Sequence, residues 1–389
     1  MQEITSSSPR DIAGTLLSRI AERGGASRAE LARETGWARS TVSQWIDRLG
    51  HAGLVVEGEA AVSAGGRPAI PVRLNPSAGK LLTATFGATH ARIGVSDLRG
   101  DPLGETEKTV RLDQGPDHVL DWTQESFREL LGQVGATAED VRAITIGLPG
   151  PVHFVHGRVV RPPIMPGWDG YPVKRHFAAR YPAPVIVDND VNLMALGALH
   201  DRFRDVDHLL FVKIGTGIGC GIVVDRRLHR GADGSAGDIG HIPVADSTEV
   251  CNCGREGCLE AVAGASAIAG ELKLASPIEI AALVHGGDPK AVHAIRRAGQ
   301  RIGRVLAGLV SFANPAAIVL GGSLAGLRDI LLTEIRSAVI GQATDLATRA
   351  LRIEISPPEV DVARLGAVAL GREAALSPEA VRRLVEKSS

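Results

Sequence analysis

The segment Gly237-Asp-Ile-Gly-His241 is followed, ten residues after the histidine, by Cys251-Asn-Cys253-Gly-Arg-Glu-Gly-Cys258-Leu-Glu260. Three of the chain's four cysteines lie within these eight residues, from Cys251 to Cys258. Three thiols and an imidazole form the Cys₃His set of a closed tetrahedral zinc site. The sequence therefore predicts a structural Zn²⁺ held by His241, Cys251, Cys253 and Cys258. Buried cysteines without a metal are the alternative.

Bulk composition limits the class of protein. A chain of 389 residues is expected to fold as two or three domains. Its 44% hydrophobic and 22% charged residues are typical of a globular protein, and its net charge of −1 excludes a global basic field for nucleic acid. With one cysteine outside the cluster, Cys220, no disulfide framework is expected. We find no signal peptide and no apolar stretch long enough to span a membrane, so a cytoplasmic protein is predicted.

The first 75 residues have the pattern of a small DNA-binding domain. Apolar residues recur at helical spacing before Gly24, and the capping box Ser27-Arg-Ala-Glu30 opens a second helix that Gly36 ends. A third helix is predicted from Ala38 to about His51. Two short strands follow, over 53–57 and 71–74, with the glycine-rich segment Ser63-Ala-Gly-Gly-Arg-Pro68 between them. This order predicts a winged helix-turn-helix, with a small helical packing domain as the alternative.

The third helix is predicted to read double-stranded operator DNA. Its polar residues are left outside when its apolar residues face the core, and in a helix-turn-helix this second helix enters the major groove. The predicted contacts to bases and phosphates are Arg39, Ser40, Thr41, Ser43, Gln44 and Arg48. Arg67, at the tip of the wing, is predicted to reach the minor groove.

From residue 76 onward, strands alternate with helices. Predicted strands over 81–86 and 91–96 are followed by a helix over 117–134 and strands over 141–146 and 185–187. A second, similar series runs from 209 to 322. Such repetition predicts a two-lobed α/β fold with a central cleft. The expected domains are residues 1–75 (winged helix-turn-helix), 76–200 (first lobe) and 201–389 (second lobe, with the zinc site and the C-terminal helices).

These motifs together resemble the ROK family of repressors and sugar kinases, and more narrowly its winged-helix transcriptional regulators. The resemblance covers nearly the whole chain. Its segments are the Gly65-Gly-Arg-Pro68 wing, Gly147-Leu-Pro-Gly150, Asn189-Asp190, Gly215-Thr-Gly-Ile-Gly219, Gly237–His241, Cys251–Glu260 and Leu320-Gly-Gly322. It implies the two-lobed, ribonuclease H-like fold of the sugar kinase, actin and Hsp70 superfamily.

The resemblance also implies a sugar site. Asn189, Asp190, His241 and Glu260 are expected to bind sugar hydroxyls, and Asp190 would be the general base in the kinases. Carboxylates accept hydrogen bonds from hydroxyls, whereas an asparagine can both donate and accept. Asp238 stands where the family usually has glutamate, one methylene longer, so a bulkier sugar or a water is expected there. Helix capping is the alternative for Asp188-Asn-Asp190, and Asp188 is the expected cap.

The nucleotide-binding loops differ from those of a working kinase. The first loop reads Thr85-Phe-Gly87-Ala-Thr89, with Thr85 where the family's kinases carry aspartate. A hydroxyl provides no charge for Mg²⁺, so loss of kinase activity is predicted. We interpret the remaining loop residues as vestiges; they are Gly87, Thr89, Gly215, Thr216, Gly217, Gly219, Gly321 and Gly322.

The sequence thus predicts a regulator, most specifically a repressor of carbohydrate genes, that responds to a sugar or sugar phosphate. A homodimer or homotetramer without membrane contact is expected, because symmetric operators need symmetric readers. The rival hypothesis is an active ATP-dependent sugar kinase with an added DNA-binding domain.

Overall fold

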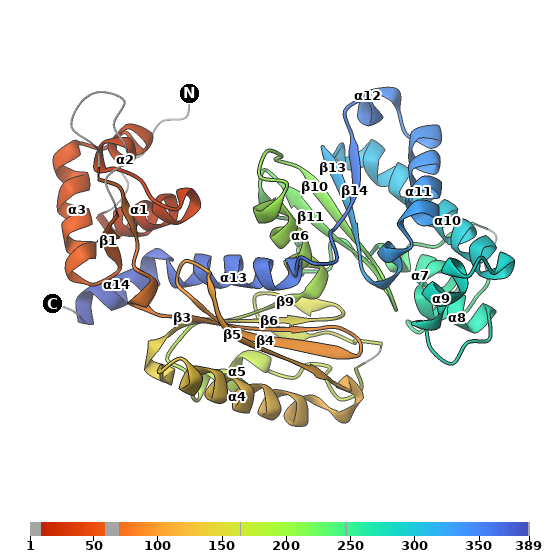
Figure 1. The fold of residues 1–389 in the computed structure, drawn as a ribbon, viewed down its shortest axis with the longest axis horizontal. Helices are drawn as coiled ribbons and strands as arrows, with labels where there is room; N and C mark the ends of the chain where they lie inside the picture. Colours follow the sequence, from red (N-terminus) through yellow and green to blue (C-terminus); the bar gives the residue numbers. More distant parts are fainter. Residues whose placement is uncertain (1–8, 59–69, 164, 246, 388–389) are drawn as a thin grey trace.

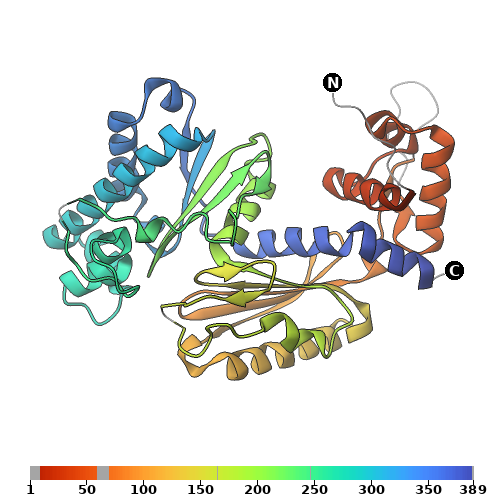
Figure 2. The same cartoon turned by 180° about the vertical axis from the view of Figure 1, so that it is seen from behind.

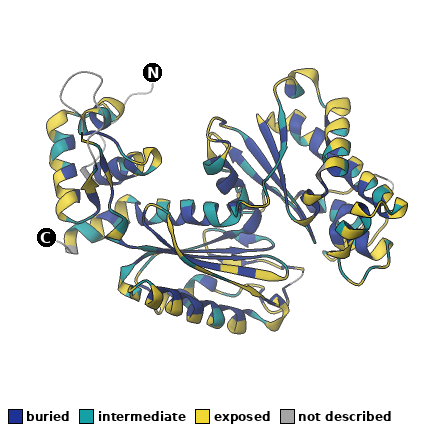
Figure 3. Ribbon diagram, viewed as in Figure 1, coloured by how far each residue is buried: buried dark blue, intermediate teal, exposed yellow. Residues whose placement is uncertain are grey.

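The computed structural model describes residues 9–58, 70–163, 165–245 and 247–387. Figure 1 shows three bodies: a helical domain at the N-terminus and two α/β lobes, each built on one five-stranded sheet. Strands in both lobes are mostly buried, whereas helices expose their outer faces (Figure 3). No helix among the described residues is long and apolar enough to cross a membrane.

The N-terminal domain has the predicted order of elements. They are α1 (Pro9–Arg23), α2 (Arg28–Thr35), α3 (Arg39–His51), β1 (Val55–Glu57) and β2 (Val72–Leu74), the two strands being antiparallel. The capping box is confirmed: the Ser27 backbone N–H donates to Glu30 Oε2 at 2.8 Å, and the Glu30 N–H donates to Ser27 Oγ at 3.2 Å. Gly36 ends α2 in the left-handed region, with φ of 71°. The wing tip with Arg67 lies outside the described residues.

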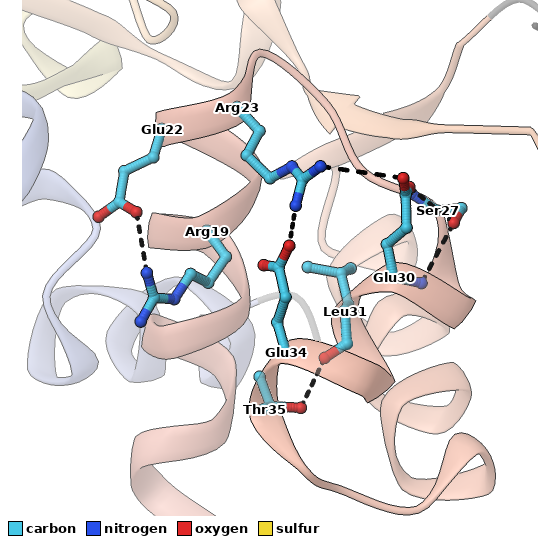
Figure 4. A network of polar contacts seen from close by, with 8 residues as sticks. All are labelled: Arg19, Glu22, Arg23, Ser27, Glu30, Leu31, Glu34 and Thr35. Carbon is cyan, nitrogen blue, oxygen red and sulfur yellow. Dashed lines mark hydrogen bonds and ion pairs between the residues drawn. The ribbon is translucent and has the colours of Figure 1, made fainter. Parts of the chain in front are cut away.

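Ion pairs tie α1 to α2 at the surface (Figure 4). Arg23 pairs with both Glu30 and Glu34, and Arg19 pairs with Glu22 along α1 at 3.2 Å. Exposed pairs contribute about 0–1 kcal/mol each, less than the about 1.5–3 kcal/mol from burying one leucine. The fully buried Leu16 and Leu31 therefore stabilise this domain more than its charges do.

The first lobe is an open sheet with the strand order β5-β4-β3-β6-β9. Its strands are β3 (Lys80–Phe86), β4 (His90–Asp97), β5 (Pro102–Thr109), β6 (Val141–Leu148) and β9 (Val185–Asn189), with a small hairpin of β7 (Val152–His153) and β8 (Arg158–Val159). Its helical segments are η1 (Pro76–Ala78), η2 (Leu112–Gln114), α4 (Pro116–Gln133), η3 (Ala138–Asp140) and α5 (Val173–Ala178). α4 covers the outer face of the sheet (Figure 1).

The second lobe has the strand order β12-β11-β10-β13-β14. The strands are β10 (Leu209–Ile214), β11 (Ile218–Val224), β12 (Arg227–Leu228), β13 (Ala317–Gly321) and β14 (Arg352–Ile355). The helical segments are η4 (Ile239–His241), α7 (Leu259–Ala263), α8 (Ala265–Glu271), α9 (Glu279–His285), α10 (Pro289–Ala313), η5 (Ser323–Gly326), α11 (Arg328–Gln342) and α12 (Asp345–Thr348). The long α10 and α11 form its outer layer (Figure 1).

Two helices join the lobes: α6 (Asp190–Asp201) follows β9, and α13 (Val362–Ala375) follows β14. They meet at a pair of glycines. A Cβ added to Gly197 would stand 1.8 Å from the Val362 carbonyl oxygen, and one added to Gly366 would stand 1.8 Å from the Leu193 carbonyl oxygen. The backbones therefore touch only because both positions lack side chains.

The C-terminal helices return to the other end of the molecule. α13 lies along the inner face of the first sheet, and both views show it running from the lobe junction toward the N-terminal domain (Figures 1 and 2). α14 (Pro378–Lys387) then packs against α1, with Val381 only 1% exposed in the core of the N-terminal domain. Residues 362–387 thus connect the second lobe to the first lobe and to the helix-turn-helix.

Candidate functional site

A cleft of about 550 Å³ lies between the two lobes. Its walls come from the β3–β4 turn, the start of α6, the end of β10 with the following turn, the segment around η4, and the start of α13. These are the ends of strands β3, β9 and β10, where open α/β sheets bind their ligands. Asn189, Asp190, Asp238, His241 and Glu260, the predicted sugar-binding residues, all line it.

Asn189 caps α6, and the prediction that Asp188 is the cap is wrong. The Asn189 Oδ1 atom accepts from the backbone N–H of Val191 at 2.8 Å, and its Nδ2 donates to the Gly150 carbonyl at 2.7 Å. Asp188 instead is buried in β9, where the Nη2 and Nε atoms of Arg230 both donate to its Oδ2 atom, at 2.7 and 2.9 Å. Both residues belong to the β9 ladder, but Asn189 directly precedes the helix and its extended backbone suits a cap, whereas the Asp188 carboxylate is engaged by Arg230 and by Asn192 Nδ2 at 2.8 Å.

Asp190 begins α6 and is 6% exposed. Its Oδ2 atom forms a close ion pair with the Nζ of Lys213, which stands at the end of β10. The pair crosses from the first lobe to the second at the floor of the cleft. The sequence reasoning missed Lys213 because a lone lysine at the end of an apolar strand has no motif.

Glu260 is held against the turn Gly215-Thr-Gly217, which follows β10. Its Oε2 atom accepts from the Ile218 backbone N–H at 3.0 Å. A Cβ on Gly217 would come within 2.4 Å of the same oxygen, so the close approach depends on that glycine. The carboxylate keeps its other oxygen available for hydrogen bonds from a ligand.

His241 stands between the cleft and the cysteine cluster. Its Nδ1 atom is 3.5 Å from Cys251 Sγ, and its Nε2 atom is 3.8 Å from Asp238 Oδ1. One ring nitrogen therefore faces the sulfur atoms while the other faces the cleft. Such an arrangement allows a metal to fix the orientation of the ring that contacts a ligand.

The predicted metal ligands come together. The ligand atoms of His241, Cys251, Cys253 and Cys258 all lie within 4.8 Å of one another, and Cys253 Sγ is 3.7 Å from Cys258 Sγ. A tetrahedral Zn²⁺ with Zn–S bonds of about 2.3 Å separates its sulfur ligands by about 3.8 Å. The donor set thus fits zinc in both chemistry and spacing, and the cluster could hold a metal.

The chain around the cluster is folded tightly by its glycines. Gly254 and Gly257 have φ of 86° and 70°, in the left-handed region. Cys251 donates its backbone N–H to the Arg255 carbonyl, and Gly254 donates to the Cys251 carbonyl. The fourth cysteine is of a different kind: burial in β11 raises the pKa of the Cys220 thiol to about 12, so it stays protonated.

The two turns that we interpreted from the sequence as vestigial nucleotide loops both line the cleft. Thr85 and Gly87 line it from the β3 side, and Gly215–Gly217 line it from the β10 side. Gly321, the last residue of β13, and Gly322, directly after it, also line the cleft. Thr85 is 8% exposed and brings a hydroxyl rather than a carboxylate to this position.

The predicted DNA contacts share one face of α3. Val42, Ile46 and Leu49 are buried, which leaves the polar side of the helix outward (Figure 3). Arg39, Ser40, Gln44 and Arg48 are exposed, whereas Thr41 and Ser43 are half-buried. Arg48 stacks over the ring of Trp45, with its guanidinium carbon 5.0 Å from the ring centroid.

Fold and site together define a class of protein: a helix-turn-helix joined to a two-lobed α/β domain with an interlobe cleft and a Cys₃His cluster. The chain belongs to the ROK family, whose model matches residues 82–374. The model of the IclR helix-turn-helix domain matches residues 11–58.

Relatives of the chain include both regulators and kinases. It is 28% identical to a putative xylose repressor of Caldicellulosiruptor sp. (strain Rt8B.4), covering 91% of this chain and 94% of the relative. It is 29% identical to a glucokinase of Thermotoga maritima, covering 76% of this chain and 98% of that one. Among solved structures, a ROK family transcriptional regulator homologous to the Escherichia coli Mlc protein aligns over 97% of this chain and 99% of its own, with a TM-score of 0.84 and 26% identity.

Proposed function

We propose that this chain is a sugar-responsive, DNA-binding transcriptional regulator that acts as a repressor. One observation carries the proposal: an exposed helix-turn-helix and a two-lobed cleft domain occur in one chain, in the arrangement of a solved regulator that aligns over 97% of it. The kinase relative covers 76% of the chain, which agrees with a kinase-like domain that begins after the DNA-binding region.

The proposed readers of the operator are Arg39, Ser40, Thr41, Ser43, Gln44 and Arg48, with Arg67 in the wing. Glutamine pairs well with adenine and arginine with guanine, while serine and threonine suit phosphate. The operator is expected to have dyad symmetry, because two helix-turn-helix units of a homodimer or homotetramer bind half-sites about one helical turn apart.

The proposed effector is a sugar bound in the cleft by Asn189, Asp190, Asp238, His241 and Glu260. The cap geometry limits Asn189, because both ends of its amide already bond to the protein. Asp190 and Glu260 are the better acceptors for hydroxyls. Zinc in the Cys₃His cluster would keep His241 and Glu260 rigid, since Glu260 lies two residues after Cys258.

The proposed coupling runs through helices. Sugar binding at the start of α6 alters the angle between the lobes, and α6 touches α13 backbone to backbone at Gly197 and Gly366. α13 continues toward α14, which packs on α1 of the DNA-binding domain. A coupling free energy of about 1–3 kcal/mol would change operator affinity about 5–150-fold.

We further propose that the domain has lost phosphoryl transfer. Thr85 provides no carboxylate to organise Mg²⁺, and Lys213 occupies Asp190, which a kinase would need as a general base. The rival, an active sugar kinase, draws on the retained glycine turns. A coupled ADP-release assay over a panel of hexoses decides between them, and turnover that disappears in Asp190→Asn would establish the kinase.

Operator binding is tested by selecting bound duplexes from a random library and measuring their affinity by fluorescence anisotropy. We expect Gln44→Ala and Arg39→Ala each to weaken specific binding by about 1–3 kcal/mol. Arg128→Ala on α4, an exposed arginine far from the helix-turn-helix, is the matched control. Failure to enrich any sequence contradicts the DNA-binding half. An operator complex that ignores every sugar tested contradicts the sensor half.

A further inference from the structure

Lys213 is the feature of the cleft that the sugar-sensor proposal leaves unexplained. It stands at the end of β10, and its partners on the two neighbouring strands are both glycines, Gly219 on β11 and Gly321 on β13. Its side chain is 23% exposed and lines the cleft, where its ammonium group pairs with Asp190. The Lys213 ammonium group is thus paired with the Asp190 carboxylate, the group that is proposed to accept a hydrogen bond from a sugar hydroxyl.

Two arginines near the cleft are already paired with carboxylates. Arg92 donates to Glu107 and to Asp361, each at 3.1 Å, and Arg230 donates through Nε and Nη2 to Asp188 Oδ2. Among the described residues that line the cleft, Lys213 and Arg92 are the ones with permanently cationic side chains. Lys213, which has a single carboxylate partner on a flexible stem, is the cation that a ligand can recruit.

The ion pair discriminates between ligands through charge. Lys213 engages only the Oδ2 atom of Asp190, so a neutral sugar can donate a hydroxyl to Oδ1 but leaves the remaining N–H donors of the ammonium group without a ligand partner. A sugar that also carries an anion matches both groups: its hydroxyl donates to Asp190 Oδ1 and its anionic oxygens accept from Lys213. Both charged side chains then remain paired.

The surroundings of Lys213 suit an anion. The backbone N–H groups of Thr216 and Gly217, in the turn directly after β10, and of Ser323, after β13, have no hydrogen-bond partner among the described residues. Unpaired backbone N–H groups beside a lysine form a favourable setting for carboxylate or phosphate oxygens. Lys213 and these groups lie on one wall of the cleft, with Glu260 beside them for further hydroxyls.

We infer that Lys213 determines ligand specificity, and that the effector is an anionic sugar whose acid group binds Lys213 while a hydroxyl binds Asp190. The inference rests on the proposed sensor function and names the chemical class of its ligand. The anion is either the carboxylate of a sugar acid or the phosphate of a sugar phosphate.

The test is calorimetric titration of the full-length protein with four probes: glucose, gluconate, glucose 6-phosphate and inorganic phosphate. We expect at least one anionic sugar to bind about tenfold more tightly than glucose, and this preference to shrink at high salt. Gluconate and glucose 6-phosphate distinguish the two sources of the anion. A wild-type preference for glucose over both overturns the inference, as does the failure of every anionic probe to bind below about 10 mM.

Variants separate recognition from a merely structural role. Lys213→Met should lose about tenfold in affinity for the anionic sugar and bind glucose no more weakly, whereas Lys213→Arg should retain the preference. Asp190→Asn should bind inorganic phosphate more tightly than wild type, because Lys213 loses its competing partner. Lys174→Met, which removes a half-buried lysine outside the cleft, is the matched control and should change none of these affinities.

The opposite pattern overturns the inference: Lys213→Met weakens glucose and the anionic sugars equally, as expected if the lysine only positions Asp190. Thermal melting of each variant shows whether it folds. If Lys213→Met does not fold, the comparison of Lys213→Arg with wild type still decides the test. Operator binding is measured separately. If the protein binds operator and responds to a neutral sugar, the proposed function stands and this inference fails. If it prefers anionic sugars but binds no operator, this inference stands and the proposed function fails.

Discussion

The sheets of the two lobes follow one plan. In each, the first strand lies at the centre, the next two pair antiparallel on one side, and the last two pair parallel on the other. Thr85 of β3 and Lys213 of β10 occupy equivalent places, two residues before the turn glycines Gly87 and Gly215. The same backbone therefore brings two side chains to one cleft, a hydroxyl from the first lobe and a cation from the second.

The lobes also share the helices that join them. α6 follows the last strand of the first sheet, and α13 follows the last strand of the second. The contact between them is reciprocal: Gly197 of α6 lies against the Val362 carbonyl, and Gly366 of α13 lies against the Leu193 carbonyl. Each carbonyl belongs to the residue four positions before the other glycine. The lobes differ most in what lies between their third and fourth strands: α4 in the first, and the Cys₃His segment with four helices in the second. The two lobes thus share one sheet topology and the crossing of α6 with α13, but differ in the segment between their third and fourth strands.

We expect the largest effect from disrupting the Cys₃His cluster, which is present in the second lobe and has no counterpart in the first. Cys258→Ser should abolish zinc binding and destabilise the second lobe by several kcal/mol, because the binding free energy of a structural metal contributes to folding. Metal analysis checks the first outcome. Hydrogen exchange checks the second: protection should fall over residues 239–263 and stay unchanged in β3 and β6.

The control for this variant is Cys220→Ala, which changes a buried cysteine outside the cluster. It should keep its zinc. A Cys258→Ser protein that melts like wild type and retains stoichiometric zinc would contradict the structural role of the cluster.

A smaller effect is expected where α6 and α13 cross. Gly366→Ala places a methyl group where the Leu193 carbonyl oxygen now stands, so α6 and α13 must separate, at about 1–3 kcal/mol of unfolding free energy. Urea unfolding measures the change. Gly308→Ala in α10, where an added Cβ meets nothing within 4 Å, is the control and should be stabilising by about 0.5–1 kcal/mol. Equal stability of the two variants would refute the tight crossing.

The effect that is smallest at neutral pH, and grows only toward acid pH, concerns His200 at the end of α6. Burial, with the charges of Arg372, Arg226 and Arg204, lowers the pKa of His200 to about 4 from its ordinary 6.5. The unfolded chain therefore takes up a proton between these values while the folded chain does not, so stability is highest above about pH 6.5 and falls as pH approaches 4.

His200→Gln should remove this part of the acid sensitivity, about 2–3 kcal/mol between pH 7 and pH 4 for a pKa lowered from 6.5 to about 4. Chemical unfolding at a series of pH values measures the slope. His285→Gln, an exposed histidine on α9, should leave the slope as it is in wild type. A steeper decline in His200→Gln would show that the histidine is charged in the folded protein.

Local features could be predicted from the sequence. The capping box of α2, the glycine that ends it and the Cys₃His cluster were all predicted correctly, because each depends on residues close in the chain. The helix cap at the start of α6 was assigned one residue too early, to Asp188 rather than Asn189. Both residues belong to β9, and their tertiary partners decide which one caps the helix: Arg230 and Asn192 engage the Asp188 carboxylate, which leaves Asn189 to accept from the Val191 N–H.

The family, the order of the elements in the N-terminal domain and the Cys₃His cluster could be predicted from the sequence, because hydrophobic periodicity, turn glycines and cysteine spacing are local properties of the chain. The tertiary structure was needed to show that Lys213 meets Asp190, that Arg230 meets Asp188, and that α13 and α14 return to the first lobe and the helix-turn-helix. These contacts join segments from different strands and lobes. They depend on how the sheets pack against α6 and α13, which no short stretch of sequence encodes.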